Sequence, residues 1–175
     1  MCHRPAAPTE CRDRPRAADR PRPGFTPALA FAFEVRAFLG PSLHIGHGGG
    51  ETTEYVPITG GTVDGPRLRG TVLAGGGDWC DRRHGVYQLD ARYLLQADDG
   101  AVIDITNRGY YHEDDPSTPA QYDGTLQVSE AGVYYRTAPV FRTDAPAHLW
   151  LARTVFIGLA RGDDSEVAIR FYSVT

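Results

Sequence analysis

The chain has 175 residues, of which 41% are hydrophobic and 23% charged, a composition typical of one globular domain. No apolar run approaches the roughly 20 residues needed to cross a bilayer, which excludes a membrane-spanning helix. The net charge is −4, and residues 1–24 carry six arginines against three acidic residues, so the remainder carries about −7. This acidic remainder lacks the basic surface expected of a nucleic-acid-binding protein.

The basic and thiol side chains restrict the possible chemistry further. All 18 basic residues are arginine, which excludes a lysine Schiff base and the lysine of a phosphate-binding loop. The three cysteines, Cys2, Cys11 and Cys80, are too few and too scattered for a disulfide framework or a zinc site. We therefore expect a cytoplasmic protein that uses no cofactor.

Residues 1–24 are dominated by proline, arginine and alanine and show no periodic apolar signal. Such a segment cannot bury enough surface to offset the entropy of ordering, so we predict a disordered extension. It does not resemble a secretory signal, because it has no apolar central region. The folded domain is expected over residues 25–175.

The first half of the domain shows strands separated by glycine-rich turns. From Leu29 to Leu39 apolar residues alternate, which predicts a strand whose odd-numbered side chains face the core. A glycine- and histidine-rich loop is expected at residues 40–50, strands at 55–58 and 67–73, and a turn at 60–62.

The stretch from Gly70 to Leu95 is predicted to form two strands joined by a glycine-rich elbow. Three successive glycines, at 75–77, suit a sharp bend or a close approach of the backbone to another group. We expect this elbow to present Asp78 and Trp79 together at the rim of the fold.

The second half of the domain continues the same pattern. In the strand over residues 87–95 the odd positions are apolar, so Asp90 and Arg92 share the opposite face, where they can pair. A hairpin turn is predicted at 98–100, with the apolar face continuing from Ala101 to Asn107. A polar loop at 112–124 and strands at 133–141, 150–159 and 167–173 complete the prediction.

About seven to nine short strands without a helical period predict an all-β fold, as an antiparallel barrel or sandwich. A closed barrel is preferred, because the last strand is too apolar to be left as a bare edge.

Several blocks in this order resemble the bacterial domain of unknown function 3237 family: VPITGGTVDGPRLRGTVLAGGGDW, LDARYLLQADDGAVIDITNRG, YYRTAPVFRT, LWLARTVFIG and IRFYSV. The resemblance spans residues 31–174. It implies a compact antiparallel barrel of the kind shared with allene oxide cyclases and dirigent-like proteins, a lipocalin-like fold that holds small apolar molecules. The family has no general assigned activity, so the fold alone does not establish a function.

Two positions depart from the pattern of the family. The turn at residues 82–85 reads RRHG where an acidic residue is expected before the glycine, and Ala152 stands where asparagine is usual beside the arginine. Both departures are expected near the mouth or lining of the barrel, where they would affect substrate specificity.

Three polar residues are the strongest candidates for an interior site. Asn107 is in phase with inward-facing isoleucines, Tyr135 follows Val133 on one face, and Arg153 is in phase with Leu151. An amide, a phenol and a guanidinium in an apolar interior could hold and polarise a carbonyl or carboxylate group. The alternative is an internal polar network that only specifies the barrel.

Asp78 is the candidate for proton transfer, and Trp79, Tyr93 and Trp150 are the candidate apolar walls for a ligand. In the alternative interpretation, Asp78 caps a turn through the backbone and Trp79 plugs one end of the barrel.

Other constellations are weaker. His44 and His47 with the acidic cluster at residues 112–115 could form a metal site only if two flexible segments met, so we expect no metal. There is no GxSxG elbow, and Cys80 has no recognisable catalytic partner.

These observations favour a cofactor-independent cyclase, isomerase or lyase that acts on a small, largely apolar carbonyl compound in the barrel. The alternative is a non-catalytic carrier of a similar apolar or aromatic metabolite. A homo-oligomer is possible on either hypothesis.

Overall fold

The structure is a computed structural model, and it describes residues 26–113 and 133–175. The predicted N-terminal extension at residues 1–24 lies outside the described residues, as does most of the predicted loop at 112–124. His112 and Glu113 are described, and they belong to a strand rather than to a loop.

The described chain forms nine strands and two short 3-10 turns, within the predicted range of seven to nine strands. The strands are β1 (Leu29–Leu39), β2 (Leu43–His47), β3 (Thr52–Asp64), β4 (Gly70–Arg83), β5 (Val86–Ala97), β6 (Val102–Glu113), β7 (Val133–Arg142), β8 (Phe156–Gly162) and β9 (Glu166–Val174). The 3-10 turns η2 (Pro146–His148) and η3 (Leu151–Arg153) connect β7 to β8.

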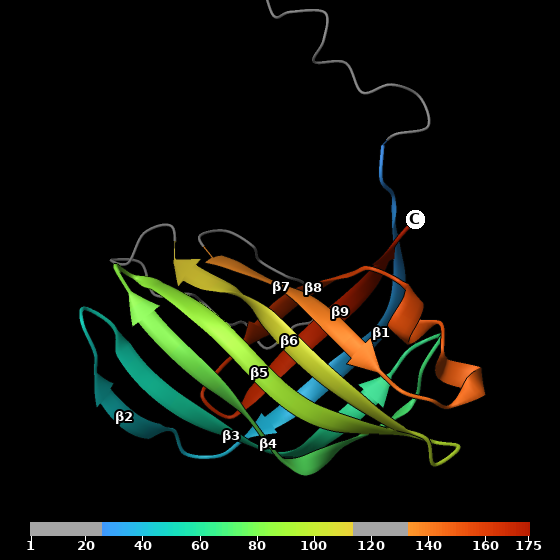
Figure 1. The fold of residues 1–175 in the computed structure, drawn as a ribbon, viewed down its shortest axis with the longest axis horizontal. Coiled ribbons are helices and arrows are strands. Elements are labelled where there is room, and N and C mark those ends of the chain that lie inside the picture. Colours follow the sequence, from blue (N-terminus) through green and yellow to red (C-terminus); the bar gives the residue numbers. More distant parts are fainter. Residues whose placement is uncertain (1–25, 114–132) are drawn as a thin grey trace, which may run out of the picture.

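The sheet closes on itself, which confirms the predicted antiparallel barrel. Its strand order is β1-β9-β8-β7-β6-β5-β4-β3-β2, and a further pairing of β1 with β3 joins the two sides (Figure 1). The strand β2 lies outside the closed ring of strands, because it pairs with β3 beyond the point where β1 ends. Closure places β9 between β1 and β8, so this apolar strand has no bare edge.

The core fills one end of the barrel, here called the packed end, where η2 and η3 lie (Figure 1). Four phenylalanines from β1, β7, β8 and β9 meet there with ring centroids 5.1 to 6.5 Å apart: Phe33, Phe141, Phe156 and Phe171. Leu68 and Leu151, both buried, lie in the segments that connect strands at this end. The opposite end, where the β4–β5 and β8–β9 connections lie, is called the cavity end.

The β1 strand differs from the prediction in its first half. Leu29 and Phe31 were expected to face the core but are 51% and 40% exposed, whereas Ala32 is buried beside Phe33. The register of β1 against β9 shifts between Phe31 and Phe33. A β-bulge inserts one residue and so reverses the alternation of side chains, which a simple period of two cannot anticipate.

Two segments predicted as loops or turns are parts of strands. The glycine- and histidine-rich stretch contains β2, and the GGT sequence at residues 60–62 lies inside β3. Gly61 has φ +151°, and a Cβ there would collide with the Arg36 carbonyl oxygen. These glycines therefore allow β1 and β3 to approach at a register shift rather than reverse the chain.

The outer surface of the sheet carries ion pairs that cross between strands. Asp90 and Arg92 share the outer face, as predicted, but they do not pair with each other. Asp90 accepts two hydrogen bonds from Arg108, and Arg92 donates two to Asp104. Asp90 lies directly opposite Arg108, and Asp104 lies diagonally across from Arg92, so each charge pairs with a charge on the neighbouring strand.

No helix in the described residues is long and apolar enough to cross a membrane.

Candidate active site

A cavity of about 390 Å³ occupies the barrel toward the cavity end. Part of its wall is apolar and comes from four strands: Ala37, Leu39, Val56, Ile58, Leu89, Ala91, Val167 and Ile169. The remaining lining residues are Glu54, Asp78, Cys80, Tyr87, Tyr93, Asn107, Tyr111, Tyr135, Thr137, Gly162, Asp163 and Asp164. Three of the predicted catalytic residues, Asp78, Asn107 and Tyr135, therefore meet in one cavity with Tyr93, a predicted ligand wall.

The strand register explains why these residues meet. Along β5 the odd-numbered side chains face inward, and the pairing of Ala91 with Asn107 aligns the inward face of β6. The same register places three tyrosines in a row across β5, β6 and β7: Tyr87, Tyr111 and Tyr135. Their rings contact edge to face, with successive centroids 5.4 Å apart. This aromatic row forms one wall of the cavity near its end.

Asp78 lies inside the barrel rather than at a rim. Its Oδ1 accepts a hydrogen bond of 2.8 Å from the backbone N–H of Asp90 on the adjacent strand. Burial raises the pKa of Asp78 to about 6, against the lowering effect of this hydrogen bond and with a further rise from the charge of Asp90. A carboxyl group with a pKa near neutrality can both accept and return a proton.

Tyr93 and Asn107 are almost fully buried, at 3% and 2% exposure. The Tyr93 hydroxyl and the Asn107 carbonyl oxygen have no hydrogen-bond partner. Burial raises the pKa of Tyr93 well above its usual value, and the charge of Asp78 adds to the rise. The Asn107 side chain lies close enough to Tyr93 to oppose this rise in the pKa of the phenol. The Tyr93 hydroxyl and the Asn107 carbonyl oxygen nevertheless do not meet the geometry of a hydrogen bond. Tyr93 is therefore a neutral phenol at physiological pH.

The charge of Asp78 also raises the pKa values of Tyr135 and Cys80. Burial raises the pKa of Tyr135 far above its usual value, and the charge of Asp78 raises it further. For Cys80, burial and then the same carboxylate raise the pKa to about 12. The thiol therefore stays protonated and is a poor nucleophile, in agreement with its lack of a recognisable partner. Asp78 is the group in this cavity whose raised pKa lies near neutrality.

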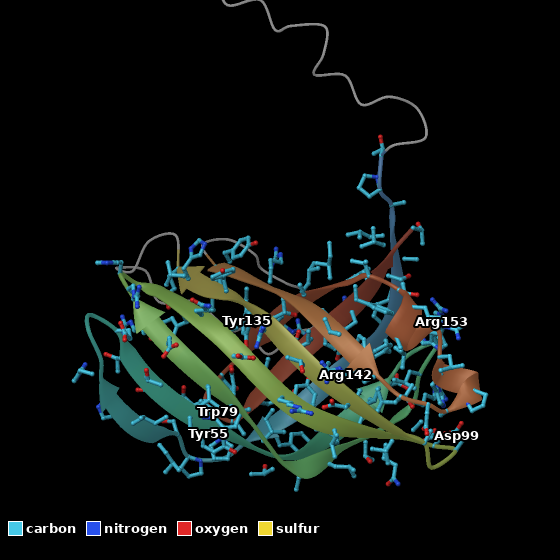
Figure 2. The ribbon with its side chains drawn as sticks, in the orientation of Figure 1. Tyr55, Trp79, Asp99, Tyr135, Arg142 and Arg153 are labelled. Atoms are coloured by element: carbon cyan, nitrogen blue, oxygen red, sulfur yellow. The ribbon has the colours of Figure 1, made fainter. Side chains whose placement is uncertain are left out.

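Trp79 does not belong to the cavity, which corrects the prediction that it lies beside Asp78. Consecutive residues of β4 point to opposite faces, so Trp79 lies outside the barrel at 50% exposure and packs on Tyr55, with ring centroids 4.7 Å apart (Figure 2). The glycines at residues 75–77 lie within β4 at a register shift, not at an elbow. They do serve a close approach, since a Cβ on Gly77 would collide with the Tyr55 ring.

Arg153 and Trp150 lie at the packed end, so the prediction that they line the cavity is wrong. Arg153 ends η3 and is exposed, and Figure 2 shows it far from Tyr135. Trp150 packs against Phe33 and Phe156, with the Arg67 guanidinium 3.7 Å from the centroid of its ring. The strand predicted from residue 150 begins only at Phe156, because two 3-10 turns precede it.

The two departures from the family pattern lie at opposite ends of the barrel. The RRHG turn joins β4 to β5 at the cavity end, where the Arg82 guanidinium lies 5.0 Å from the centroid of the Tyr87 ring. Ala152 lies in η3 at the packed end. Only the first departure is therefore placed to affect what enters the cavity.

Sequence reasoning missed several lining residues. Thr137 is 5% exposed, and its hydroxyl has no hydrogen-bond partner. Glu54, Tyr87, Tyr111, Asp163 and Asp164 were also not singled out as site residues. The alternation of side chains along β5 and β7 could have indicated that Tyr87 and Thr137 face inward. Assigning Glu54 to the cavity required the register of β3 against β4.

The described residues contain no group of three or more His, Cys, Asp or Glu side chains arranged to hold a metal ion. His47 instead hydrogen-bonds Thr52 through Nδ1 at 2.9 Å, and its ring contacts that of His44.

Comparison with known proteins gives a consistent assignment. The model of a family described as a protein of unknown function, DUF3237, matches residues 27–174. A UPF0311 protein of Clostridium acetobutylicum is 34% identical over 123 residues, which are 70% of this chain and 77% of that protein. The crystal structure of a protein of unknown function from Rhodopseudomonas palustris matches with a TM-score of 0.77 and 28% identity, over 86% of this chain and 99% of that chain.

One further relative has a named activity. A hydroalkoxylation enzyme of Penicillium herquei is 33% identical over 87 residues, which are 50% of this chain and 56% of that protein.

Proposed function

The chain belongs to the DUF3237 family, and from this membership and the geometry of the cavity we propose that it is a cofactor-independent enzyme for intramolecular addition. Its substrate would be a small, largely apolar carbonyl compound that carries a hydroxyl group and a carbon–carbon double bond. The reaction class is cyclisation, in which the hydroxyl oxygen adds to the double bond.

One observation carries the proposal: a carboxyl group with a pKa of about 6 faces a cavity that also holds buried, neutral phenols. Asp78 is the group for proton transfer, and Tyr93 and Tyr135 are hydrogen-bond donors for a carbonyl oxygen. The apolar wall would exclude water and hold the chain of the substrate in a folded conformation.

The reaction balances without an external reagent. In the proposed step the carboxylate of Asp78 takes the proton from the substrate hydroxyl as the oxygen attacks the β-carbon of a double bond conjugated to the carbonyl. A C–O bond forms, the π bond shifts to give an enolate, and Tyr93 or Tyr135 donates a hydrogen bond to the enolate oxygen. Asp78 then returns the proton to the α-carbon. No electron is gained or lost, so side chains alone can supply the chemistry.

The hydroalkoxylation enzyme of Penicillium herquei supports this reaction class, because hydroalkoxylation is the addition of an O–H group across a double bond. The relationship covers half of the present chain, and we transfer only the class of reaction from it. The choice of substrate rests on the cavity.

The proposal can be tested with 2′-hydroxychalcone, a neutral phenol whose ring closure to flavanone changes its absorbance and creates a stereocentre. The wild type should give one enantiomer in excess, whereas spontaneous closure gives a racemate. Replacing Asp78 with asparagine should lower kcat/KM by about 100-fold, the usual scale of general acid–base catalysis. Asp104→Asn, an outward carboxylate of β6 that is not among the groups that shift the pKa of Asp78, is the matched control and should change kcat/KM less than about twofold.

The pH dependence gives a second readout. Because the carboxylate form of Asp78 acts first, kcat/KM should rise as pH increases through about 6 and then level off. This rise of kcat/KM with pH should be absent in the Asp78→Asn variant. If the wild type and variants bind the chalcone and its saturated analogue but none produces enantiomeric excess, the protein is a carrier for such molecules and the enzyme proposal is wrong.

A further inference from the structure

The polar lining of the cavity separates into two groups of different charge. One group is acidic and consists of Glu54, Asp78, Asp163 and Asp164. The other is neutral and consists of Tyr87, Tyr93, Tyr111, Tyr135, Asn107, Thr137 and Cys80. No arginine, lysine or histidine is among the described residues that line the cavity.

Three of the neutral side chains carry buried polar atoms without a partner. These atoms are the Tyr93 hydroxyl, the Asn107 carbonyl oxygen and the Thr137 hydroxyl, and each side chain is at least 95% buried. Buried polar groups in folded proteins are nearly always hydrogen-bonded, so three orphans around one cavity indicate a partner that enters it. An internal polar network would have satisfied these groups among themselves.

The register arranges the three side chains in a diagonal row. Tyr93 lies opposite Ile105 on β6, Asn107 is two residues further along β6, and Thr137 lies opposite Gly109, two residues further again. Each step crosses to the next strand and moves by one inward-facing position. The row therefore follows the cavity wall, with an acceptor between two hydroxyl groups.

Cations near the cavity end do not alter this arrangement. Arg82 lies against the Tyr87 ring, but it is exposed and is not among the lining residues. A ligand carboxylate inside the cavity would face Asp78 and Glu54, with the exposed Asp163 and Asp164 near the mouth, and no lining cation. Like charges in a partly desolvated site repel more strongly than in water.

We propose that the cavity selects an uncharged ligand whose carbonyl and hydroxyl groups are bound by the row Tyr93, Asn107 and Thr137, and that it rejects carboxylates. This inference rests on the proposed function in that it assigns the substrate class of the same cavity. Tyr93 donates to the ligand carbonyl, Asn107 accepts from the ligand hydroxyl, and Thr137 can take either role.

Two fluorescent probes that cannot cyclise test the inference by binding alone. They are 6-hydroxy-2-acetonaphthone, which is neutral, and 6-hydroxy-2-naphthoate, which differs in carrying a carboxylate. At pH 7 the ketone should bind at least about tenfold more tightly than the carboxylate. Equal affinity, tighter binding of the carboxylate, or no binding of the ketone up to its solubility limit would each overturn the inference.

Variants separate the neutral row from the acidic group. Tyr93→Phe and Thr137→Val should each weaken ketone binding by about three- to tenfold, since each removes one hydrogen bond to the ligand. Their thermal midpoints without ligand should not fall, because the lost hydroxyl has no partner in the protein. Thr106→Val, on the outer face of β6, is the matched control and should leave the affinity unchanged.

Replacing Glu54 with glutamine should improve carboxylate binding relative to ketone binding by removing one repelling charge. Unchanged ketone affinity in both Tyr93→Phe and Thr137→Val would also overturn the inference. These measurements do not depend on turnover: probe selectivity without chalcone cyclisation would reject the enzyme proposal alone, and cyclisation without probe selectivity would reject this inference alone.

Discussion

The carboxyl group of Asp78 and the backbone N–H of Asp90 are joined by a hydrogen bond of 2.8 Å across the β4–β5 ladder. The two aspartates use opposite faces of the sheet. Asp78 projects into the cavity, and Asp90 projects outward to Arg108. The hydrogen bond holds the interior carboxylate in place, but it does not offset the desolvation that raises its pKa.

Replacing Asp78 with asparagine should stabilise the protein at high pH and have little effect at low pH. The folded-state pKa of about 6 exceeds the ordinary aspartate value of 3.8, so ionisation of Asp78 disfavours the folded state as pH rises from about 4 to 6. Above pH 6 the full penalty applies, up to roughly 3 kcal/mol, and below pH 3.8 it vanishes. Urea unfolding at pH 8 should show the variant more stable by about 1 to 3 kcal/mol. A variant that is equally destabilised at high pH and at low pH would contradict the pKa assigned to Asp78.

Arg153→Ala and Tyr135→Phe should separate the two ends of the barrel. Tyr135 lines the cavity, so removing its hydroxyl should lower kcat/KM for 2′-hydroxychalcone by about tenfold. Arg153 is exposed at the packed end, and its loss should change kcat/KM less than about twofold. Equal losses in both variants would mean that the exposed guanidinium influences the site after all. Circular dichroism of both proteins controls for folding.

Gly77→Ala should destabilise the barrel by about 1 to 3 kcal/mol, because the added Cβ collides with the ring of Tyr55. The same substitution in a Tyr55→Ala background should cost less, since the colliding ring is gone. Gly49→Ala is the control: a Cβ there meets nothing within 4 Å, and its unfolding free energy should be unchanged. An equal cost of Gly77→Ala in both backgrounds would reject the collision as the cause.

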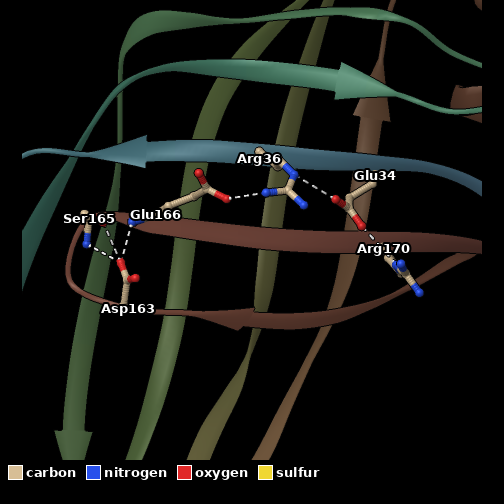
Figure 3. Close-up of polar contacts among 6 residues, drawn as sticks. All are labelled: Glu34, Arg36, Asp163, Ser165, Glu166 and Arg170. Carbon is tan, nitrogen blue, oxygen red and sulfur yellow. Dashed lines mark hydrogen bonds and ion pairs between the residues drawn. The ribbon is translucent and has the colours of Figure 1, made fainter. Parts of the chain in front are cut away.

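Glu34→Gln should destabilise the β1–β9 pairing by about 1 kcal/mol, since one carboxylate serves two arginines. Glu34 lies 3.0 Å from Arg36 and 2.9 Å from Arg170, and its side chain is 15% exposed (Figure 3). Glu166→Gln should cost less, because Glu166 contacts only Arg36 in this chain of ion pairs. In 1 M NaCl both losses of stability, measured by thermal unfolding, should become smaller because salt screens the ion pairs. A loss that does not respond to salt would indicate packing rather than charge.

The local patterns of the sequence determined the fold class and much of the strand content. Alternation in the segment from Tyr87 to Asn107 predicted which side chains face inward, and those predictions are confirmed by the burial of Leu89, Tyr93 and Ile105. Alternation is a property of consecutive residues, so it needs no knowledge of distant partners. It fails at the bulge in β1, where one extra residue reverses the phase.

The composition of the site was decided only by the tertiary structure. The sequence singled out Asp78, Asn107 and Tyr135, and the pairing register from β4 to β7 brings these three to one cavity. The sequence could not show that Arg153 lies at the other end, because two 3-10 turns interrupt an apolar run that reads as a strand. Nor could it show that burial inside a closed barrel raises the pKa of Asp78, since desolvation depends on which strands surround a group and not on its neighbours in the chain.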